Sequence, residues 1–160
     1  QEFYNQAVAA GIRANLSLFE HFEPPEKYDT VLMSFILEHI TQPGKLLMRA
    51  REWADRLIVV VGNANSYHRQ LAVKMGIQPE LHSLSARDIT VGHLRVYSPT
   101  TITQELGRAG WQVRARHGLF FKPLPNAMLA QMSPELIQAM NEIECPPDCA
   151  GNMVLECRRF

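Results

Sequence analysis

The chain of 160 residues has three cysteines, no excess charge of either sign and no long apolar run. Three cysteines cannot all pair, and Cys145-Pro-Pro-Asp-Cys149 lacks the spacing and the second ligand pair of a common zinc site, so we expect neither a disulfide framework nor a metal. Sixteen basic and sixteen acidic residues cancel, and no basic stripe indicates a nucleic-acid partner. No segment approaches the roughly 18 apolar residues of a membrane span. We therefore expect a cytoplasmic protein with a small-molecule partner.

Short apolar runs predict strands. Thr30–Met33 and Leu57–Val61 lack strict polar alternation, which predicts parallel strands buried on both faces. Ile12–Leu18 alternates in part and predicts another strand. Trp111–Leu119 and Met153–Arg158 predict an antiparallel pair at the edge of the sheet. The fold class that follows is α/β, with a doubly wound, mostly parallel sheet and an antiparallel C-terminal edge pair.

Helices are predicted from apolar residues at helical spacing and from residues that begin or end helices. The predicted helices are Glu2–Ala10, a helix with Pro43 in its first turn, Tyr67–Gly76, a helix from Ser98-Pro99 to Gly110, and one that starts at Ser133. Residues 77–97 show little periodicity. We interpret them as a lid or substrate-binding insertion, because long loops in compact domains are usually functional or disordered.

Polar side chains directly follow the first predicted parallel strand, in the segment Ser34 to His39. In open α/β sheets, ligands bind in the crevice outside the carboxyl ends of the strands. Glu38 and His39 are therefore candidates for a binding or catalytic role. The spacing supports equally well the alternative that they only begin the next connection.

The segment around this strand resembles a known family. Lys27-Tyr28-Asp29 followed by Leu37-Glu38-His39-Ile40 is similar to the fourth-strand motif of class I S-adenosylmethionine-dependent methyltransferases, in their small-molecule branch. Further segments resemble the same family, in order along nearly the whole chain: Asn65–Gly76, Gly92–Pro99, Ala109–Trp111 and Phe121–Asn126. The resemblance implies a Rossmann-like sheet and S-adenosylmethionine as the cofactor, but it does not specify a substrate.

One characteristic feature of that family is missing. Its members have a first strand that ends in Gly-x-Gly-x-Gly and a second strand that ends in an acidic residue. Upstream of Lys27 the only glycine is Gly11, and the chain begins with Gln1. We therefore expect residues 1–160 to be a partial domain, the C-terminal two-thirds, beginning in the helix after the second strand. Part of the cofactor pocket would then lie outside this sequence.

The resemblance implies two groups of cofactor-binding residues. The loop after the family's third strand borders the adenine, and it falls here on Leu18, Phe19 and Glu20. The turn after the fourth strand faces the methionine and sulfonium part, and it falls on Ser34, Phe35, Leu37 and His39. The family often has an acidic residue where Leu18 falls, and Phe35 fits a hydrophobic core equally well.

On the acceptor side, a histidine near the pocket suits the removal of a proton, because its ordinary pKa is about 6.5. His93 is the first candidate, since the resemblance places Gly92–Tyr97 over the active site, and His39 is the second, closer to the donor. Alternate residues of an extended segment face one side, which groups His93 with Arg95 and Tyr97. The predicted substrate-binding residues are His68, Arg69, Arg95 and Tyr97. The alternative for this segment is a surface strand with hydrogen-bonded polar residues.

Two classes of function follow from these observations. The first is methyl transfer from S-adenosylmethionine to oxygen, nitrogen or carbon of a small molecule, such as a sugar or secondary metabolite. The second is a non-catalytic methyltransferase-like subunit that acts as a structural or regulatory partner, because a sheet without its first strands would expose an unpaired edge. A nicotinamide-dependent reductase shares the layout, but its tyrosine-lysine pairing is not found here. The sequence leaves a homo-oligomer open.

Overall fold

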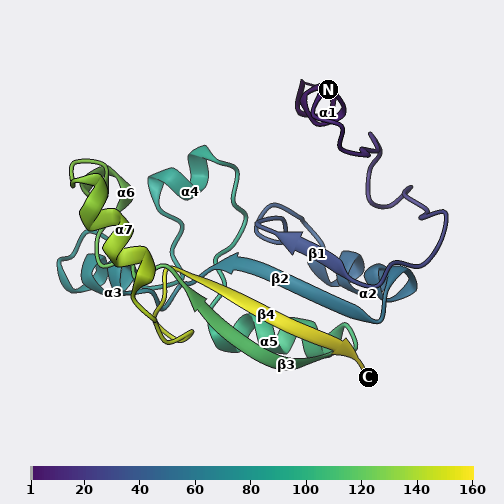
Figure 1. Ribbon diagram of the computed structural model, residues 1–160. Coiled ribbons are helices and arrows are strands. Elements are labelled where there is room, and N and C mark those ends of the chain that lie inside the picture. The colour runs from purple at the N-terminus through teal and green to yellow at the C-terminus, as the bar shows by residue number, and fades with distance from the viewer. Residues whose placement is uncertain (1) are drawn as a thin grey trace.

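The computed structural model describes residues 2–160 (Figure 1). Its strands are β1 (Val31–Ser34), β2 (Arg56–Gly62), β3 (Trp111–Leu119) and β4 (Asn152–Arg159). Its helices are α1 (Glu2–Ala9), α2 (Pro43–Trp53), α3 (Tyr67–Lys74), α4 (Ala86–Thr90), α5 (Pro99–Arg108), α6 (Asn126–Leu129) and α7 (Pro134–Glu142). The five predicted helices are confirmed, and α4 and α6 are additional.

The sheet has the strand order β1-β2-β4-β3. β1 pairs with β2 in parallel, with Val31 opposite Leu57, whereas β4 is antiparallel to both β2 and β3. It follows that β1, β2 and β3 run in one direction and only β4 runs against them. This arrangement confirms the predicted α/β class with an antiparallel C-terminal pair, in which β3 forms the sheet edge.

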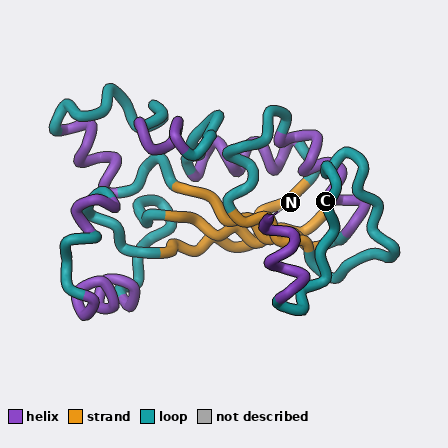
Figure 2. The backbone as a smooth tube through the Cα atoms, turned by 90° about the horizontal axis from the view of Figure 1, so that it is seen from above, coloured by secondary structure: helices purple, strands orange, loops and turns teal. Residues whose placement is uncertain are grey.

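The hydrophobic core lies between one face of the sheet and the helices α2 and α5. Figure 2 shows helices along one side of the strands. Leu57 and Val59 of β2 face Leu47 of α2 and Leu106 of α5 within one buried cluster. Trp111, 1% exposed, also donates its indole N–H to the carbonyl oxygen of Leu47 at 2.8 Å. Burial of such side chains, about 1.5–3 kcal/mol each, holds these helices on the sheet.

The start of α5 shows how local sequence sets an element boundary. The Ser98 side chain accepts a hydrogen bond from the Thr101 N–H, and the Thr101 side chain accepts one from the Ser98 N–H. Pro99 occupies the first turn, where the missing N–H has no cost, and Gly110 follows the helix with φ +84°. The predicted Ser-Pro start and Gly110 end are confirmed.

One predicted strand is absent, and the burial predicted for another is wrong in part. Ile12–Leu18 contains no strand, because alternation predicts a strand only where a neighbouring strand supplies backbone hydrogen bonds, and among residues 2–160 none pairs with it. The predicted burial of β1 on both faces is also wrong, since Leu32 is 60% exposed. In β2, Ile58 and Val60 are only partly buried.

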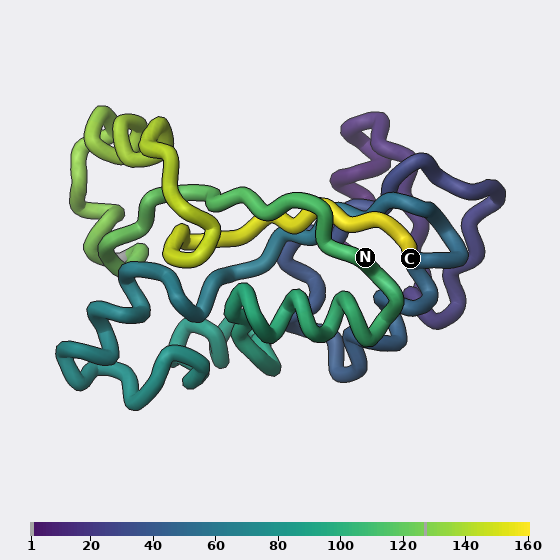
Figure 3. The backbone as a smooth tube through the Cα atoms, turned by 90° about the horizontal axis from the view of Figure 1, so that it is seen from below, coloured from purple at the N-terminus to yellow at the C-terminus, as the bar shows by residue number. Residues whose placement is uncertain are grey.

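The face of the sheet opposite α2 and α5 is largely open. Its residues include Leu32, Ile58, Val154 and Glu156, which share a face through the strand register. The segment with α1 lies at one end of the sheet, and α3, α6 and α7 lie at the other, so neither covers the middle (Figures 1 and 3). None of the helices in the described part of the chain combines the length and apolarity that crossing a membrane requires.

Candidate functional site

Three connections meet at the carboxyl edge of the sheet, because β1, β2 and β3 run in the same direction. They are the turn 35–41 after β1, the turn 63–66 after β2, and the segment 120–125 after β3. Residues 77–97, which include α4, stand beside the first two connections (Figure 1). This edge is where an open α/β sheet places its ligand, so the site is built from these segments.

The turn after β1 begins with a strained residue. Phe35 has φ +52°, a left-handed conformation that costs a non-glycine residue about 1 kcal/mol or more, and such strain is often found at functional sites. Its N–H donates to the carbonyl oxygen of Val60 at 2.9 Å. Phe35 and Ile36 are 46% and 40% exposed, whereas Leu37 is fully buried. The turn therefore presents two apolar side chains to solvent at the strand end.

Glu38 is buried, with 1% of its surface exposed. Its Oε1 accepts a hydrogen bond from the Gly62 N–H at 2.9 Å, and its carbonyl oxygen accepts one from the Leu94 N–H at 2.8 Å. Within residues 2–160, the buried Oε2 has no hydrogen-bond partner. Glu38 thus joins the ends of β1 and β2 to the 77–97 segment and keeps one acceptor for a further donor.

Arg95 fixes the turn after β1 through its guanidinium. It donates to the carbonyl oxygens of Leu37 at 2.8 Å and of Thr41 at 3.3 Å, and also to that of Ile40. Three carbonyls held by one planar cation define the path of residues 37–41. The turn and the 77–97 segment are therefore coupled.

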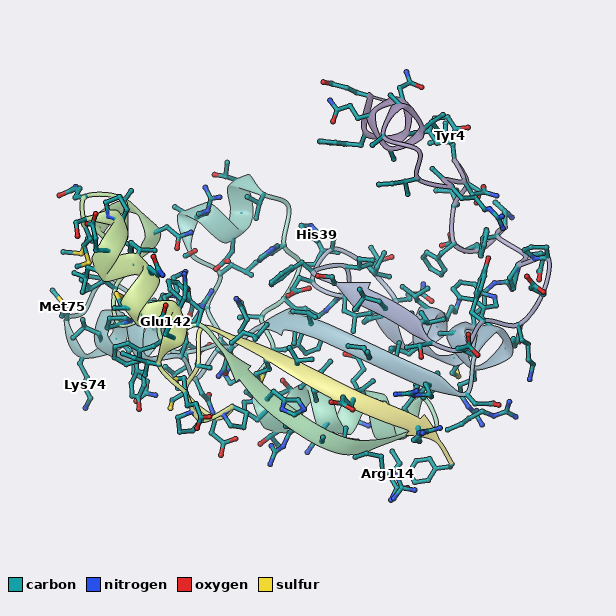
Figure 4. The ribbon with its side chains drawn as sticks, viewed as in Figure 1. Tyr4, His39, Lys74, Met75, Arg114 and Glu142 are labelled. Carbon is teal, nitrogen blue, oxygen red and sulfur yellow. The ribbon has the colours of Figure 1, made fainter. Side chains whose placement is uncertain are left out.

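The structure brings His39 and His93 together. Their ring centroids lie 4.7 Å apart with an interplanar angle of 77°, and Figure 4 shows His39 between the end of β1 and the α4 segment. His39 Nδ1 lies 3.2 Å from the carbonyl oxygen of Gly92, and His93 Nδ1 lies 3.1 Å from Asp88 Oδ1. Both oxygens only accept hydrogen bonds, so each Nδ1 carries the proton, and Nε2 is the basic atom of either ring when neutral.

Asp88 holds this arrangement in place. Burial raises the pKa of its carboxyl, but hydrogen bonds from Ser85 and the neighbouring Arg69 outweigh that effect and lower it overall. Oδ2 accepts hydrogen bonds from the Ser85 N–H and hydroxyl at 2.8 and 2.7 Å and from Arg69. An ionised Asp88 orients His93 in the manner of a carboxylate-histidine pair.

Arg69, 7% exposed, lies deeper than the histidines. Besides Asp88, its guanidinium donates to the carbonyl oxygens of Leu81 at 3.2 Å and Ser83 at 3.0 Å. His68 and Lys122 are its neighbours, and the His68 N–H donates to the Lys122 carbonyl oxygen at 3.1 Å. Burial, then Lys122 and Arg69, lower the pKa of His68 to about 4.

Tyr97 does not share the surroundings of His93 and Arg95. It is 3% exposed, and its hydroxyl donates to Glu105 Oε2 at 2.7 Å. Burial, followed by the Glu105 carboxylate, raises the pKa of this hydroxyl above its ordinary value. The extended alternation predicted for the segment is interrupted after His93, so the three side chains contact different parts of the protein.

Several residues that hold the site together are not among the sequence-based candidates. Asn63, 2% exposed, donates from Nδ2 to the carbonyl oxygens of Pro147 and Ala150, both at 3.1 Å, and accepts from the Asn65 N–H at 2.8 Å. It attaches the loop before β4 to the end of β2. Lys122 was missed too, because its neighbours on α3 are distant in the sequence. Asp88 was missed although Ser85 and His93 lie within five residues of it, and the Ser85-x-x-Asp88 capping pattern was the available signal. For Asn63, its place among the turn-forming residues that follow β2 was the available sequence signal.

The residues expected near the adenine lie beside β1. Phe19, together with Phe22, Met33, Ile36, Ile40 and others, lines an apolar groove of about 540 Å³ between the 13–28 segment and β1. Leu18 is 66% exposed, and Glu20 and Ser34 are exposed. Phe19 is thus the member of its predicted trio that lines a groove.

No family model and no curated protein matches the sequence. Solved structures do match. One is an S-adenosylmethionine-dependent methyltransferase from Mesorhizobium loti, with 14% sequence identity and a TM-score of 0.60. The match covers 99% of this chain and 76% of that protein. A second is a methyltransferase from Thermotoga maritima, described as a possible histamine N-methyltransferase, with 15% sequence identity and a TM-score of 0.67. The match covers all of this chain and 70% of that protein.

An O-methyltransferase from neocarzinostatin biosynthesis, in complex with S-adenosyl-L-homocysteine and 1,4-dihydroxy-2-naphthoic acid, is 15% identical with a TM-score of 0.56. The match covers 99% of this chain and 37% of that protein. The chain therefore has the fold of S-adenosylmethionine-dependent methyltransferases, and the resemblance in the sequence is confirmed at the level of the fold.

Proposed function

We propose that this protein transfers the methyl group of S-adenosylmethionine to oxygen, nitrogen or carbon of a small molecule. The observation that carries the proposal is the Asp88–His93 pair beside His39, at the carboxyl edge of a sheet with a methyltransferase fold. Solved proteins of this fold support the cofactor and the class of acceptor, since one of them holds S-adenosyl-L-homocysteine and a dihydroxynaphthoic acid.

Two features of the site fit the cofactor. The apolar groove lined by Phe19 and Ile36, with the exposed Phe35 next to Ile36 in the chain, suits an adenine ring. The buried Glu38 carboxylate, with an unpartnered Oε2, suits a donor or a positive charge. We assign His39 to the same region through its place in the turn after β1. Roles for Leu18, Glu20, Ser34 and Leu37 remain predictions.

When bound, the cofactor supplies an electrophilic methyl group for in-line displacement. The chain must then orient the acceptor and, for a hydroxyl or amine, remove its proton. His93 Nε2 takes that proton, because Nδ1 donates to the ionised Asp88, which also stabilises the imidazolium that forms. Arg95 acts as a positioning residue, since it holds the 37–41 carbonyls against the segment that carries His93.

The test combines calorimetric titration of S-adenosylmethionine and S-adenosylhomocysteine with transfer of labelled methyl groups to a panel of hydroxylated aromatics, sugars and amines. General-base catalysis contributes about 10²- to 10⁴-fold, so His93→Gln should lower kcat by at least about 10²-fold for a hydroxyl or amine acceptor. Cofactor binding should stay within about threefold, since His93 acts on the acceptor.

His117→Gln is the matched control, because His117 also pairs with a carboxylate, Glu156, but on the open side of the sheet. It should leave kcat unchanged. If the His93→Gln enzyme is as active as the wild type and has the same pH profile, His93 is not the general base. Folded protein that binds neither form of the cofactor would contradict methyl transfer altogether.

A second candidate function is a non-catalytic methyltransferase-like subunit. It is favoured by the edge of β1, which pairs only with β2 among the described strands and carries the exposed Leu32. An unpaired apolar edge is a docking site for another chain. Light scattering of the wild type and of Leu32→Lys tests this, since a charge on the edge should dissociate an assembly built on it.

A further inference from the structure

Four basic side chains surround one carboxylate next to the candidate active site. Arg69 and His68 come from α3, Arg87 from α4, and Lys122 from the segment after β3, while Asp88 is the acidic member. We call these four basic residues the basic cluster. Arg69 is buried, His68 and Lys122 are half-buried, and Arg87 is exposed. The cluster therefore extends from the interior to the surface.

The positions of these side chains are set by the fold. Lys122 follows β3 and accepts the His68 N–H through its carbonyl oxygen at 3.1 Å. Its stem lies against Gly151, where an added Cβ would be 3.0 Å from the Lys122 Cβ. Arg69 is held by the Leu81 and Ser83 carbonyls and by Asp88. These contacts place the charges beside each other independently of any ligand.

The cluster has more positive charge than its carboxylate can neutralise. Asp88 already binds Arg69, Ser85 and His93, which leaves Lys122 and Arg87 without a carboxylate of their own in the cluster. Burial, then Arg69 and Arg87, lower the pKa of Lys122, and burial, then Lys122 and Arg69, lower that of His68 to about 4. In the described chain, the buried His68 Nδ1 has no hydrogen-bond partner.

We infer that the basic cluster binds the carboxylate or phosphate group of the methyl acceptor, with Lys122 and Arg87 as the direct ligands. The inference rests on the proposed function for the identity of the ligand. Asp88 connects the two sites, since Oδ1 lies 3.1 Å from His93 while Oδ2 accepts from Arg69. Asp88 therefore joins the proposed base to Arg69 of the basic cluster, which places the cluster next to His93.

Inorganic phosphate and acetate are the probes, with sodium chloride at equal ionic strength as the reference. The readout is the imidazole Cε1–H signal of His68 by NMR, which reports its pKa. An anion bound to Lys122 and Arg87 offsets the positive charge of Lys122, which helps to lower the pKa of His68, so saturating phosphate should raise that pKa from about 4. Lys122→Met and Arg87→Met should each weaken phosphate binding by about 10-fold or more, since each removes a charge-assisted hydrogen bond.

Lys74→Met is the matched control, because Lys74 is an exposed lysine at the outer end of α3 (Figure 4). It should bind phosphate as the wild type does. Lys122→Met should also unfold at a higher denaturant concentration than the wild type, because an uncompensated, half-buried charge is removed. A loss of stability would instead show that Lys122 has a structural role, and would contradict the inference.

Two further results would overturn or reassign the proposed anion site. A His68 signal that responds equally to phosphate and chloride, or that responds in Lys122→Met as in the wild type, overturns the anion site. Competition between S-adenosylhomocysteine and phosphate would assign the cluster to the cofactor's carboxylate instead of the acceptor. The phosphate experiment contains no cofactor, so its failure is distinguishable from failure of the methyltransferase proposal.

Discussion

Two histidine–carboxylate pairs lie within the described residues 2–160, one at the carboxyl edge of the sheet and one on its open side. His93 Nδ1 is 3.1 Å from Asp88 Oδ1, and His117 Nε2 is 2.9 Å from Glu156 Oε1. Their distances are similar, but the side chains of the first pair are 22% and 13% exposed and those of the second are 54% and 48% exposed. Water screens the second pair, so only the first can hold a fixed orientation strongly.

The difference lies mainly in what holds the carboxylate. Asp88 is fixed by Ser85 and by the buried Arg69, whose other donors bind backbone carbonyls. Glu156 stands on β4, on the face of the sheet whose middle is left open by the helices of residues 2–160. A histidine beside a carboxylate is therefore weak evidence of function by itself, whereas a histidine beside a carboxylate that is shielded from water and held by other donors indicates a prepared site.

The largest expected effect comes from breaking the buried ion pair. Arg69→Met leaves the half-buried Asp88 without its cation and frees the Leu81 and Ser83 carbonyls, so we expect a loss of about 3 kcal/mol in the free energy of unfolding. Arg116→Gln, which removes the exposed Arg116–Asp148 pair, should cost at most about 1 kcal/mol. Urea unfolding of both variants measures the difference, and equal losses would contradict it.

A smaller effect is expected from Arg95→Met. The substitution removes three charge-assisted hydrogen bonds to the carbonyls of Leu37, Ile40 and Thr41, and we expect a loss of about 2 kcal/mol. Arg114→Met is the control, because Arg114 lies exposed on β3 at the far end of the sheet (Figure 4), and its loss should stay within about 0.5 kcal/mol. Denaturant midpoints at constant slope give both values.

Arg95→Lys sharpens the same comparison. A lysine keeps the charge but cannot bind three carbonyls with one planar group, so it should restore less than half of the lost stability. Full restoration would show that charge alone holds the 37–41 turn.

The open side was the harder half to predict, and the reason is physical. Trp111–Leu119 was predicted with the bounds that β3 has, and Ser98-Pro99 predicted the start of α5, because turn and capping residues act locally. The exposure of Leu32 was not predicted. This exposure depends on which elements cover a face of the sheet, and the sequence of a single apolar strand does not determine which elements pack against it.

At the carboxyl edge, the sequence predicted the histidines but not their partners. His39 and His93 were named, and their rings are in contact. The Asp88–Arg69 pair and the position of Lys122 were missed, because the contacts of α4 and of the segment after β3 with α3 are set by tertiary packing. Arg95 was predicted as a substrate ligand, and the structure shows it bound to three backbone carbonyls.

The free energy of unfolding should also depend on pH through His68, near the carboxyl edge of the sheet. The pKa of His68 is lowered to about 4, below the ordinary value of about 6.5 that it has in the unfolded chain. As pH falls below about 6.5, the unfolded chain therefore binds the proton first, and the free energy of unfolding falls until about pH 4. His68→Gln should remove this part of the slope. Urea titrations at several pH values measure it, and an unchanged slope in the variant would contradict the buried neutral histidine.

The smallest effect is expected at the exposed pair, and it tests the comparison most directly. A double-mutant cycle of His117→Gln and Glu156→Gln should give a coupling energy below about 1 kcal/mol, because both side chains are about half exposed and pay for their fixed geometry in entropy. The cycle of His93→Gln and Asp88→Asn should give a larger coupling at the same pH, because Asp88 is already ordered by Ser85 and Arg69. Equal couplings would mean that the burial of Asp88 adds nothing to its hold on His93, and the case for a prepared base at the carboxyl edge would fail with it.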